Sequence, residues 1–228
     1  MRETYLNKLE ILNQSLIDMG NNVEYALARS VRALLDRDMD LAAKTIEFDK
    51  DIDQEMKEIE RQCINLLMRQ QPVAKDLRFI SAALKMVSDL ERIGDQAADI
   101  AEICLQLSKD CDVNSIPEIS QMTDAVKVML RNSVKAVVDQ NVDLAFCVCD
   151  SDDAVDSLFY QAKFRLISMI KSNEKNSIYA MDLFMITKYL ERIGDHTVNV
   201  ANWVIFSDSG IHNGVNLMGY INDKLDEK

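Results

Sequence analysis

The heptapeptide DLERIGD spans Asp89 to Asp95, and the heptapeptide YLERIGD spans Tyr189 to Asp195, at a shift of 100 residues. A second pair of similar segments, VRALLDRDMDLA from Val31 and VKAVVDQNVDLA from Val134, repeats at a shift of 103 residues. Two matches at nearly the same offset indicate an internal duplication. The chain is therefore expected to contain two copies of one structural unit.

Apolar residues recur in alternating steps of three and four through most of the chain, which is the pattern of helices packed in a bundle. Six Gly and two Pro among 228 residues also favour long helices over a turn-rich sheet protein. The pattern predicts six helices. The first ends near residue 36, and the second and third cover about 41–71 and 75–109. The last three cover about 117–139, 142–172 and 177–206. The predicted fold is all-α, with two tandem, pseudo-symmetric three-helix bundles.

The predicted boundaries place the first bundle at 1–110, the second at 111–208 and a C-terminal tail at 209–228. Between the copies, the segment SIPE from Ser115 has the form of a capping box with proline in the first turn of the next helix. Three Gly in the last twenty residues predict an irregular tail. The methionines and Trp203 are expected in the core.

Composition excludes several classes of function. The formal net charge of −12 repels the phosphate backbone of nucleic acids, so no direct DNA or RNA binding is expected. A polar N-terminus and the lack of a run of about 20 apolar residues predict a cytoplasmic protein without a membrane-inserted segment. The five Cys form no CxxC pair and are expected to be reduced thiols buried as small hydrophobic groups.

Carboxylates recur every four residues in the third predicted helix of each copy. This spacing keeps the side chains on one helix face, where three of them extend over roughly 12 Å. The preceding helix carries a pair of acids at the same spacing. The positions are Asp49, Asp53, Glu91, Asp95 and Asp99 in the first copy, and Asp152, Asp156, Glu191, Asp195 and Asn199 in the second.

Like charges four residues apart destabilise a helix by roughly 0.2–0.5 kcal/mol per pair, and multivalent cations would offset this repulsion. Because the chain has only two His, the ligands would be oxygens, which suit Mg²⁺, Ca²⁺, Mn²⁺ or oxygen-ligated iron. The alternative is a solvated acidic face paired with Arg92 and Arg192. Because the same acidic pattern occurs in both copies, metal binding is favoured over this alternative. Gly94 and Gly194, inside predicted helices, indicate close approach of a neighbouring helix or a ligand.

The paired ERIGD helices, the D-x-x-x-D pairs on the preceding helices and the segment PVAKDLR, from Pro72 to Arg78, together resemble the PhoU family of phosphate-transport regulators. The resemblance covers nearly the whole chain. It implies two three-helix bundles with clusters of metal ions (Mg, Mn, Fe or Zn) held at the positions listed above. It also implies an accessory of the phosphate ABC transporter that restrains phosphate uptake and, through a membrane sensor histidine kinase, represses phosphate-starvation genes, without catalysis.

The two copies differ at positions that matter for this resemblance. Asn199 stands where the first copy has Asp99, and the second copy has no counterpart of PVAKDLR. We therefore expect the first bundle to hold metal more firmly and to carry more of the partner contact. The expected partners are the transporter's ATPase subunit and the sensor kinase, with peripheral membrane association through them, and a second copy of the chain in a dimer.

Three other functions are compatible with the sequence. The chain could be a metal-free helical adaptor whose acids bind basic partner surfaces, or a PhoU-like regulator of another transporter. A carboxylate-bridged di-metal enzyme is disfavoured, because ferritin-like centres use Glu-x-x-His pairs and neither His196 nor His212 has a Glu three residues before it.

Overall fold

The computed structural model describes residues 2–70, 72–108, 111–212 and 215–216. The first copy forms three long helices: α1 (Arg2–Asp36), α2 (Met39–Gln70) and α3 (Ala74–Gln106). The second copy forms α4 (Pro117–Asp139), α5 (Val142–Asp150), α6 (Asp152–Ser172) and α7 (Ser177–Ser209). Short 3-10 turns, Val113–Ser115 and Glu174–Asn176, precede α4 and α7. The predicted all-α fold of two helical bundles is confirmed.

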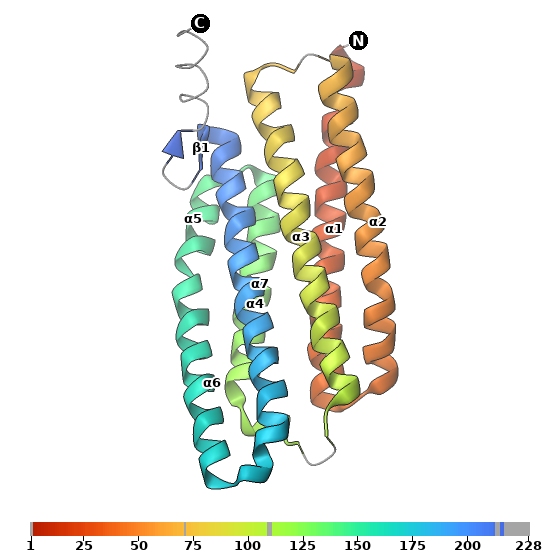
Figure 1. The fold of residues 1–228 in the computed structure, drawn as a ribbon. Helices are drawn as coiled ribbons and strands as arrows, with labels where there is room; N and C mark the ends of the chain where they lie inside the picture. The colour runs from red at the N-terminus through yellow and green to blue at the C-terminus, as the bar shows by residue number, and fades with distance from the viewer. Residues whose placement is uncertain (1, 71, 109–110, 213–214, 217–228) are drawn as a thin grey trace, which may run out of the picture.

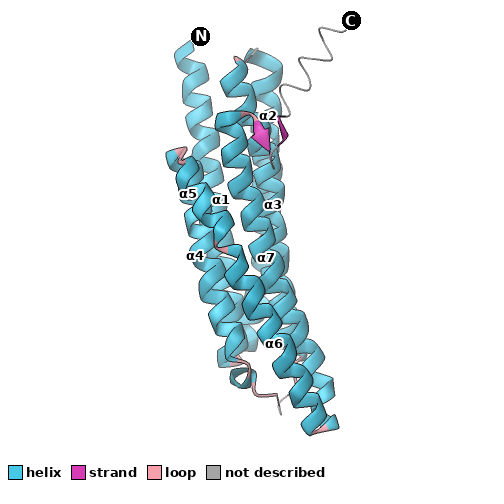
Figure 2. Ribbon diagram, turned by 90° about the vertical axis from the view of Figure 1, so that its left-hand side faces the viewer, coloured by secondary structure: helices cyan, strands magenta, loops and turns pink. Residues whose placement is uncertain are grey.

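The helices lie along one long axis in two layers (Figures 1 and 2). The first layer contains α2, α3, α7 and the consecutive helices α5 and α6, and the second contains α1 and α4. The two copies join where α3 packs along α7 and where α1 packs along α4. Both pairs run antiparallel, so the two bundles are related by a pseudo-twofold arrangement that places α3 and α7 at the centre.

The central position of α3 follows from its sequence. An outer helix buries one stripe, whereas α3 is buried on the sides that face α1, α2 and α7. Many of its buried positions are small, which allows neighbouring helices to approach closely; the buried alanines are Ala82, Ala83, Ala97, Ala98 and Ala101. None of the helices in the described part of the chain is both long and apolar enough to cross a bilayer.

The segment predicted as one helix over 142–172 is helical, but a break at Ser151 divides it into α5 and α6. The Ser151 hydroxyl donates a hydrogen bond to the Cys147 carbonyl oxygen at 2.7 Å. The Ser151 N–H bonds the Val148 carbonyl oxygen at 3.1 Å, three residues back instead of four. Such local serine bonds compete with the helical ladder, and α5 ends at Asp150, with Ser151 between it and α6.

The predicted capping box at the start of α4 is wrong, although Pro117 does occupy the first turn. Ile116 is the N-cap residue and makes no side-chain capping bond. Glu118 is instead buried and accepts bonds from Arg165 of α6, with Nε at 2.9 Å and Nη2 at 2.8 Å. A tertiary ion pair has therefore replaced the local cap.

Several side chains expected in the core are exposed. Cys147 is exposed and Cys149 partly exposed, whereas the other three thiols are buried as expected. Among the methionines that the structure describes, Met39, Met68, Met181 and Met185 are exposed. Trp203 is only partly buried and stacks on His212 at a centroid distance of 3.8 Å. The described part of the tail contains a two-residue antiparallel pair, β1 (Ile211–His212) with β2 (Val215–Asn216).

Candidate metal centre

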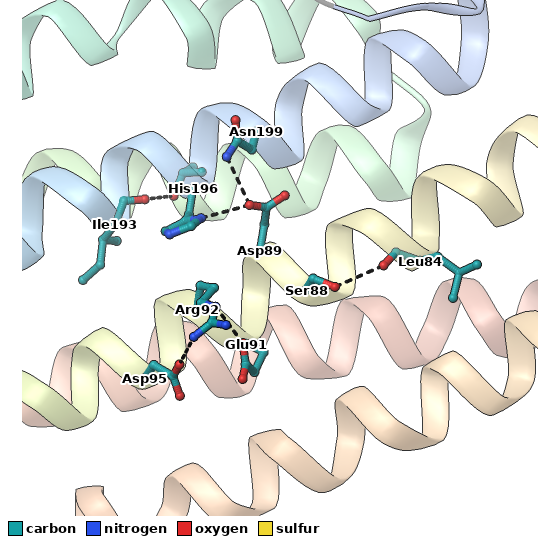
Figure 3. Close-up of polar contacts among 10 residues, drawn as sticks. Leu84, Ser88, Asp89, Glu91, Arg92, Asp95, Ile193, His196 and Asn199 are labelled. Atoms are coloured by element: carbon teal, nitrogen blue, oxygen red, sulfur yellow. Dashed lines mark hydrogen bonds and ion pairs between the residues drawn. The ribbon is translucent and has the colours of Figure 1, made fainter. Parts of the chain in front are cut away.

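In the first copy, α2 and α3 bring acidic side chains together at the middle of their length. Oxygens of Asp53, Glu91 and Asp95 all lie within 4.8 Å of one another, and the three residues are partly buried. Figure 3 shows Glu91 and Asp95 projecting from the same side of α3. Hard cations bind oxygen ligands at about 2.0–2.6 Å, so oxygens with this separation can share one ion.

Asp49 completes this group from α2, and Gly94 of α3 makes room for it. A Cβ atom at Gly94 would lie 3.3 Å from Asp49 Oδ1 and 3.1 Å from two side-chain atoms of Ile52. Burial raises the pKa of Asp49 to about 6, and repulsion from the other four acidic positions of the first copy adds to the shift. Burial, followed by repulsion from Asp95, also raises the pKa of Glu91.

The second copy repeats the approach of an aspartate to a helical glycine, but among the described residues three carboxylates converge within 4.8 Å only in the first copy. A Cβ atom at Gly194 would lie 3.0 Å from Asp152 Oδ1, so the missing side chain again lets an aspartate approach the neighbouring helix. Burial raises the pKa of Asp152 to about 6, and repulsion from Asp195, Asp156 and Glu191 contributes further. The structure thus brings a carboxylate of the acidic pair into contact with two acids of the ladder in the first copy, whereas in the second copy the acids repel one another without meeting as closely. The expected close approach at the two glycines is made by a neighbouring helix in both copies.

Basic side chains distinguish the two groups. Lys188 Nζ donates to Glu191 Oε1 at 2.6 Å. The first copy has Ser88 at the corresponding position, and its hydroxyl bonds the Leu84 carbonyl oxygen at 3.3 Å. Sequence reasoning missed Lys188, although the change from serine to lysine at a shift of 100 residues was visible. A lysine on Glu191 competes with a cation for the same oxygens.

Arg92 makes two of the ion pairs of the first group, and Lys57 makes a third, with its Nζ 3.8 Å from Asp53 Oδ2. Arg92 Nη1 lies 3.0 Å from Asp95 Oδ2 and Arg92 Nε lies 3.6 Å from Glu91 Oε2 (Figure 3). The arginine side chain is 61% exposed, so these contacts are well solvated and weak. The alternative of an acidic face paired with basic side chains is therefore realised in part: Arg92 pairs with Glu91 and Asp95, and Lys57 pairs with Asp53. Both basic side chains are more than half exposed, so they neutralise the group only weakly.

The last position of each ladder faces the contact between the two copies. Asn199 Nδ2 donates to Asp89 Oδ1 at 3.1 Å, and His196 Nδ1 lies 2.9 Å from the same oxygen (Figure 3). In the pseudo-symmetric contact, Tyr189 hydrogen-bonds Asp99. The first residue of each heptapeptide thus reaches the opposite copy, which was not foreseen from the sequence.

The PVAKDLR segment supplies one further contact between the copies. Arg78 Nε and Nη2 lie 3.2 and 3.0 Å from the carbonyl oxygens of Ser207 and Asp208. A guanidinium is well suited to the unsatisfied carbonyls at the end of a helix, here α7. Arg78 therefore has a structural role, while Val73 in the same segment is 67% exposed.

The raised pKa values predict that the stability of the metal-free protein and the stabilisation by added metal change in opposite directions with pH. Between about pH 4 and pH 6 the folded protein holds more protons on Asp49 and Asp152 than the unfolded chain does. The stability of metal-free protein should therefore fall as pH rises through this window. Because cations require ionised carboxylates, the stabilisation by added metal should grow over the same range.

Melting temperatures at several pH values, measured once in chelator and once in excess metal, give the pH dependence of the stability in each condition. Replacing Asp49 and Asp152 by asparagine should reduce the pH dependence of the metal-free protein. Identical pH profiles for the wild type and this variant would contradict the assignment of the two aspartates.

Comparison with known proteins places these features in a family. The model of the PhoU domain matches residues 16–104 and 119–204, one match in each copy. A protein of Clostridium acetobutylicum, described as a phosphate-specific transport system accessory protein PhoU homolog, is 39% identical over 92% of this chain and 96% of its own length. A homolog with the same description from Aquifex aeolicus is 36% identical over 81% of this chain and 84% of its own length.

Solved structures agree with the sequence relatives. The crystal structure of PhoU from Pseudomonas aeruginosa superposes with a TM-score of 0.87 at 32% identity, covering 91% of this chain and 100% of that one. The phosphate transport system regulatory protein PhoU from Streptococcus pneumoniae gives a TM-score of 0.85 at 26% identity, covering 92% and 100%. The similarity therefore extends over both copies and their mutual packing.

Proposed function

The chain belongs to the PhoU family, and from this premise we propose that it is a metal-binding regulator of phosphate homeostasis. In this proposal the protein acts in the cytoplasm as an accessory of a phosphate ABC transporter and limits uptake by contact with the ATPase subunit. It also keeps phosphate-starvation genes off through a membrane sensor histidine kinase. The role is regulatory and involves no catalysis.

One observation carries the metal part of the proposal: both copies place an aspartate of raised pKa against a helical glycine, facing an acidic ladder. A packed protein retains mutually repelling, partly buried carboxylates at a cost in stability. A hard cation would remove that repulsion and connect α2 to α3, and α6 to α7. Asp49, Asp53, Glu91 and Asp95 would hold it in the first copy, and Asp152, Asp156, Glu191 and Asp195 in the second.

Two alternatives make different predictions. A metal-free adaptor should keep its fold and partner binding after dialysis against chelator, whereas a metal-dependent regulator should lose thermal stability. A di-metal enzyme receives little support, because His196 is directed at Asp89 on the α3–α7 contact. The imidazole of His196 is thus engaged in the contact between the copies and not in an acidic group.

The regulatory part is tested by deleting the gene. We expect phosphate-starvation genes to become active in phosphate-rich medium, because the accessory protein that keeps the sensor off is missing. Transcript levels of the transporter genes measure the effect, and a plasmid copy of the wild-type gene should restore repression.

A copy carrying Glu91→Ala with Glu191→Ala should restore less repression if metal is needed for signalling. Normal repression in the deletion strain would contradict the proposal and indicate a PhoU-like partner of another transporter.

A further inference from the structure

An apolar surface lies on the outward sides of α6 and α7, below the second acidic group. Two of its side chains are 65% and 74% exposed, at Phe164 and Ile178. The spacing within each helix, three or four residues per step, keeps the side chains on one stripe. We call this surface the α6–α7 apolar face; it consists of Tyr160, Phe164 and Ile167 on α6 and Ile178, Met181 and Met185 on α7.

The two stripes are neighbours in space. α6 and α7 run side by side and antiparallel (Figure 1), and the rings of Phe159 and Phe184 meet between them at a centroid distance of 5.8 Å. Tyr160 and Met185 each follow one of these aromatic residues in the sequence, so the exposed stripes flank the same contact. Of the exposed methionines, Met181 and Met185 are thus part of a continuous surface and are not isolated exceptions to the core.

The first copy shows that this face is not needed for folding. At the corresponding positions of α2 and α3, at shifts of 103 and 100 residues, five of the six residues are polar or charged; the six are Lys57, Arg61, Ile64, Arg78, Ser81 and Lys85. The α2–α3 pair packs in the same way with only Ile64 exposed and apolar among these six positions. A contiguous exposed apolar surface confined to one copy indicates contact with another molecule.

The surroundings of the face are more basic than the rest of the chain. Residues 157–188 contain five basic and two acidic side chains, in a chain whose net charge is −12. Arg165 and Lys188 are ion-paired with Glu118 and Glu191, which leaves the other three basic side chains against the two acids of this stretch. Lys163, Lys171 and Lys175 are exposed within this stretch. The partner should therefore combine an apolar layer with negative charge.

We propose that the α6–α7 apolar face binds the surface of an anionic lipid bilayer. Aromatic and aliphatic side chains bordered by lysines are the composition of helices that lie in the interface of such membranes. The lysines can extend to lipid phosphates while the apolar side chains enter the acyl boundary. At physiological ionic strength the acidic remainder of the chain is screened beyond about 8 Å, so its repulsion does not prevent this contact.

A second copy of the chain fits this face less well. A twofold dimer places the same patch against itself, which would bring Lys163, Lys171 and Lys175 toward the same lysines of the other copy. A bilayer that contains phosphatidylglycerol instead presents negative charge to these lysines. The inference does not depend on the regulatory function proposed above, because purified protein and lipid are sufficient to test it.

Co-sedimentation of the full chain with vesicles tests the proposal. The wild type should bind phosphatidylcholine vesicles that contain phosphatidylglycerol, and should bind pure phosphatidylcholine vesicles at least about tenfold more weakly, since each lysine at an anionic surface contributes roughly fivefold in affinity. Lys163→Glu with Lys171→Glu should weaken binding by at least about 25-fold, because each substitution removes a positive charge and adds a negative one. Phe164→Ser with Met181→Ser should weaken it at least about tenfold.

The matched control is Ile64→Ser with Met68→Ser in the first copy, at positions that are 49% and 79% exposed. This variant should bind like the wild type. Failure of the wild type to bind anionic vesicles, or undiminished binding of the face variants, would overturn the proposal. Two other results would also overturn it. If the wild type does not bind vesicles and Phe164→Ser reduces self-association, the face is an interface between copies. If the face variants bind vesicles like the wild type and lose only the binding of an acidic protein, the face is a protein-binding surface.

Discussion

Replacing Glu91 by Gln and Asp95 by Asn is expected to abolish metal binding by the first copy and, at the same time, to stabilise the metal-free protein. Two of the three oxygen groups that lie within 4.8 Å of one another lose their charge. Substitutions of residues that only support a metal ligand already reduce affinity about 10–100-fold, so loss of two ligands should exceed about 100-fold. Removing like charges four residues apart should raise the melting temperature in chelator.

Calorimetric titration with divalent metal and thermal melting in chelator measure the two effects. Their opposite directions separate this outcome from simple misfolding, which would lower both affinity and melting temperature. Unchanged metal affinity would contradict the assignment of the first centre.

The second copy supplies the control, Glu191→Gln with Asp195→Asn. Because Lys188 already neutralises Glu191, this variant should lose less metal affinity and gain less stability than the first-copy variant. Equal losses in both copies would show that the lysine does not distinguish the two centres. Such a result would also contradict the expectation that the first bundle holds metal more firmly.

Gly94→Val should have the largest effect on stability among single substitutions in the first centre. Its Cβ atom would lie 3.1 Å from Ile52, which is fully buried, and 3.3 Å from Asp49 Oδ1. The added methyl groups require α2 and α3 to move apart, and such overpacking costs about 1–3 kcal/mol. Displacement of Asp49 should also weaken metal binding.

Chemical denaturation measures the free energy of unfolding, with Lys85→Val as the control on the same helix. Lys85 is exposed, so this substitution should change stability by no more than about 0.5 kcal/mol. Adding Ile52→Val to Gly94→Val removes the Cδ1 atom that Cβ approaches and should recover part of the loss. A Gly94→Val protein as stable as the wild type would show that the helices do not need this close approach.

Much of the candidate site could be predicted because its pattern is local to single helices. Residues four apart share a helix face whatever the tertiary structure, so the ladders and the α2 pair follow from spacing alone. The duplication then showed that Asp49 and Asp152 are equivalent, and the structure gives both the same glycine neighbour and the same direction of pKa shift. Internal repetition replaced the information that an alignment would have supplied.

Features that depend on two segments meeting could not be predicted in this way. The bond of Asn199 to Asp89 requires the antiparallel register of α3 against α7, which no single helix encodes. Glu118 looked like a local cap because its partner Arg165 lies 47 residues away. The break at Ser151 depends on a side-chain bond that competes with the helix only weakly.

The sequence by itself determined the helices, the two copies and the acidic faces, since each is set by periodicity within one element. Only the tertiary structure decided which carboxylates converge, which are directed to the contact between the copies, and which apolar stripes remain exposed. The reason is physical: burial and charge pairing are properties of neighbouring surfaces. A stripe such as Tyr160, Phe164 and Ile167 has the spacing of a core in the sequence and is left exposed only by the position of α6 beside α7.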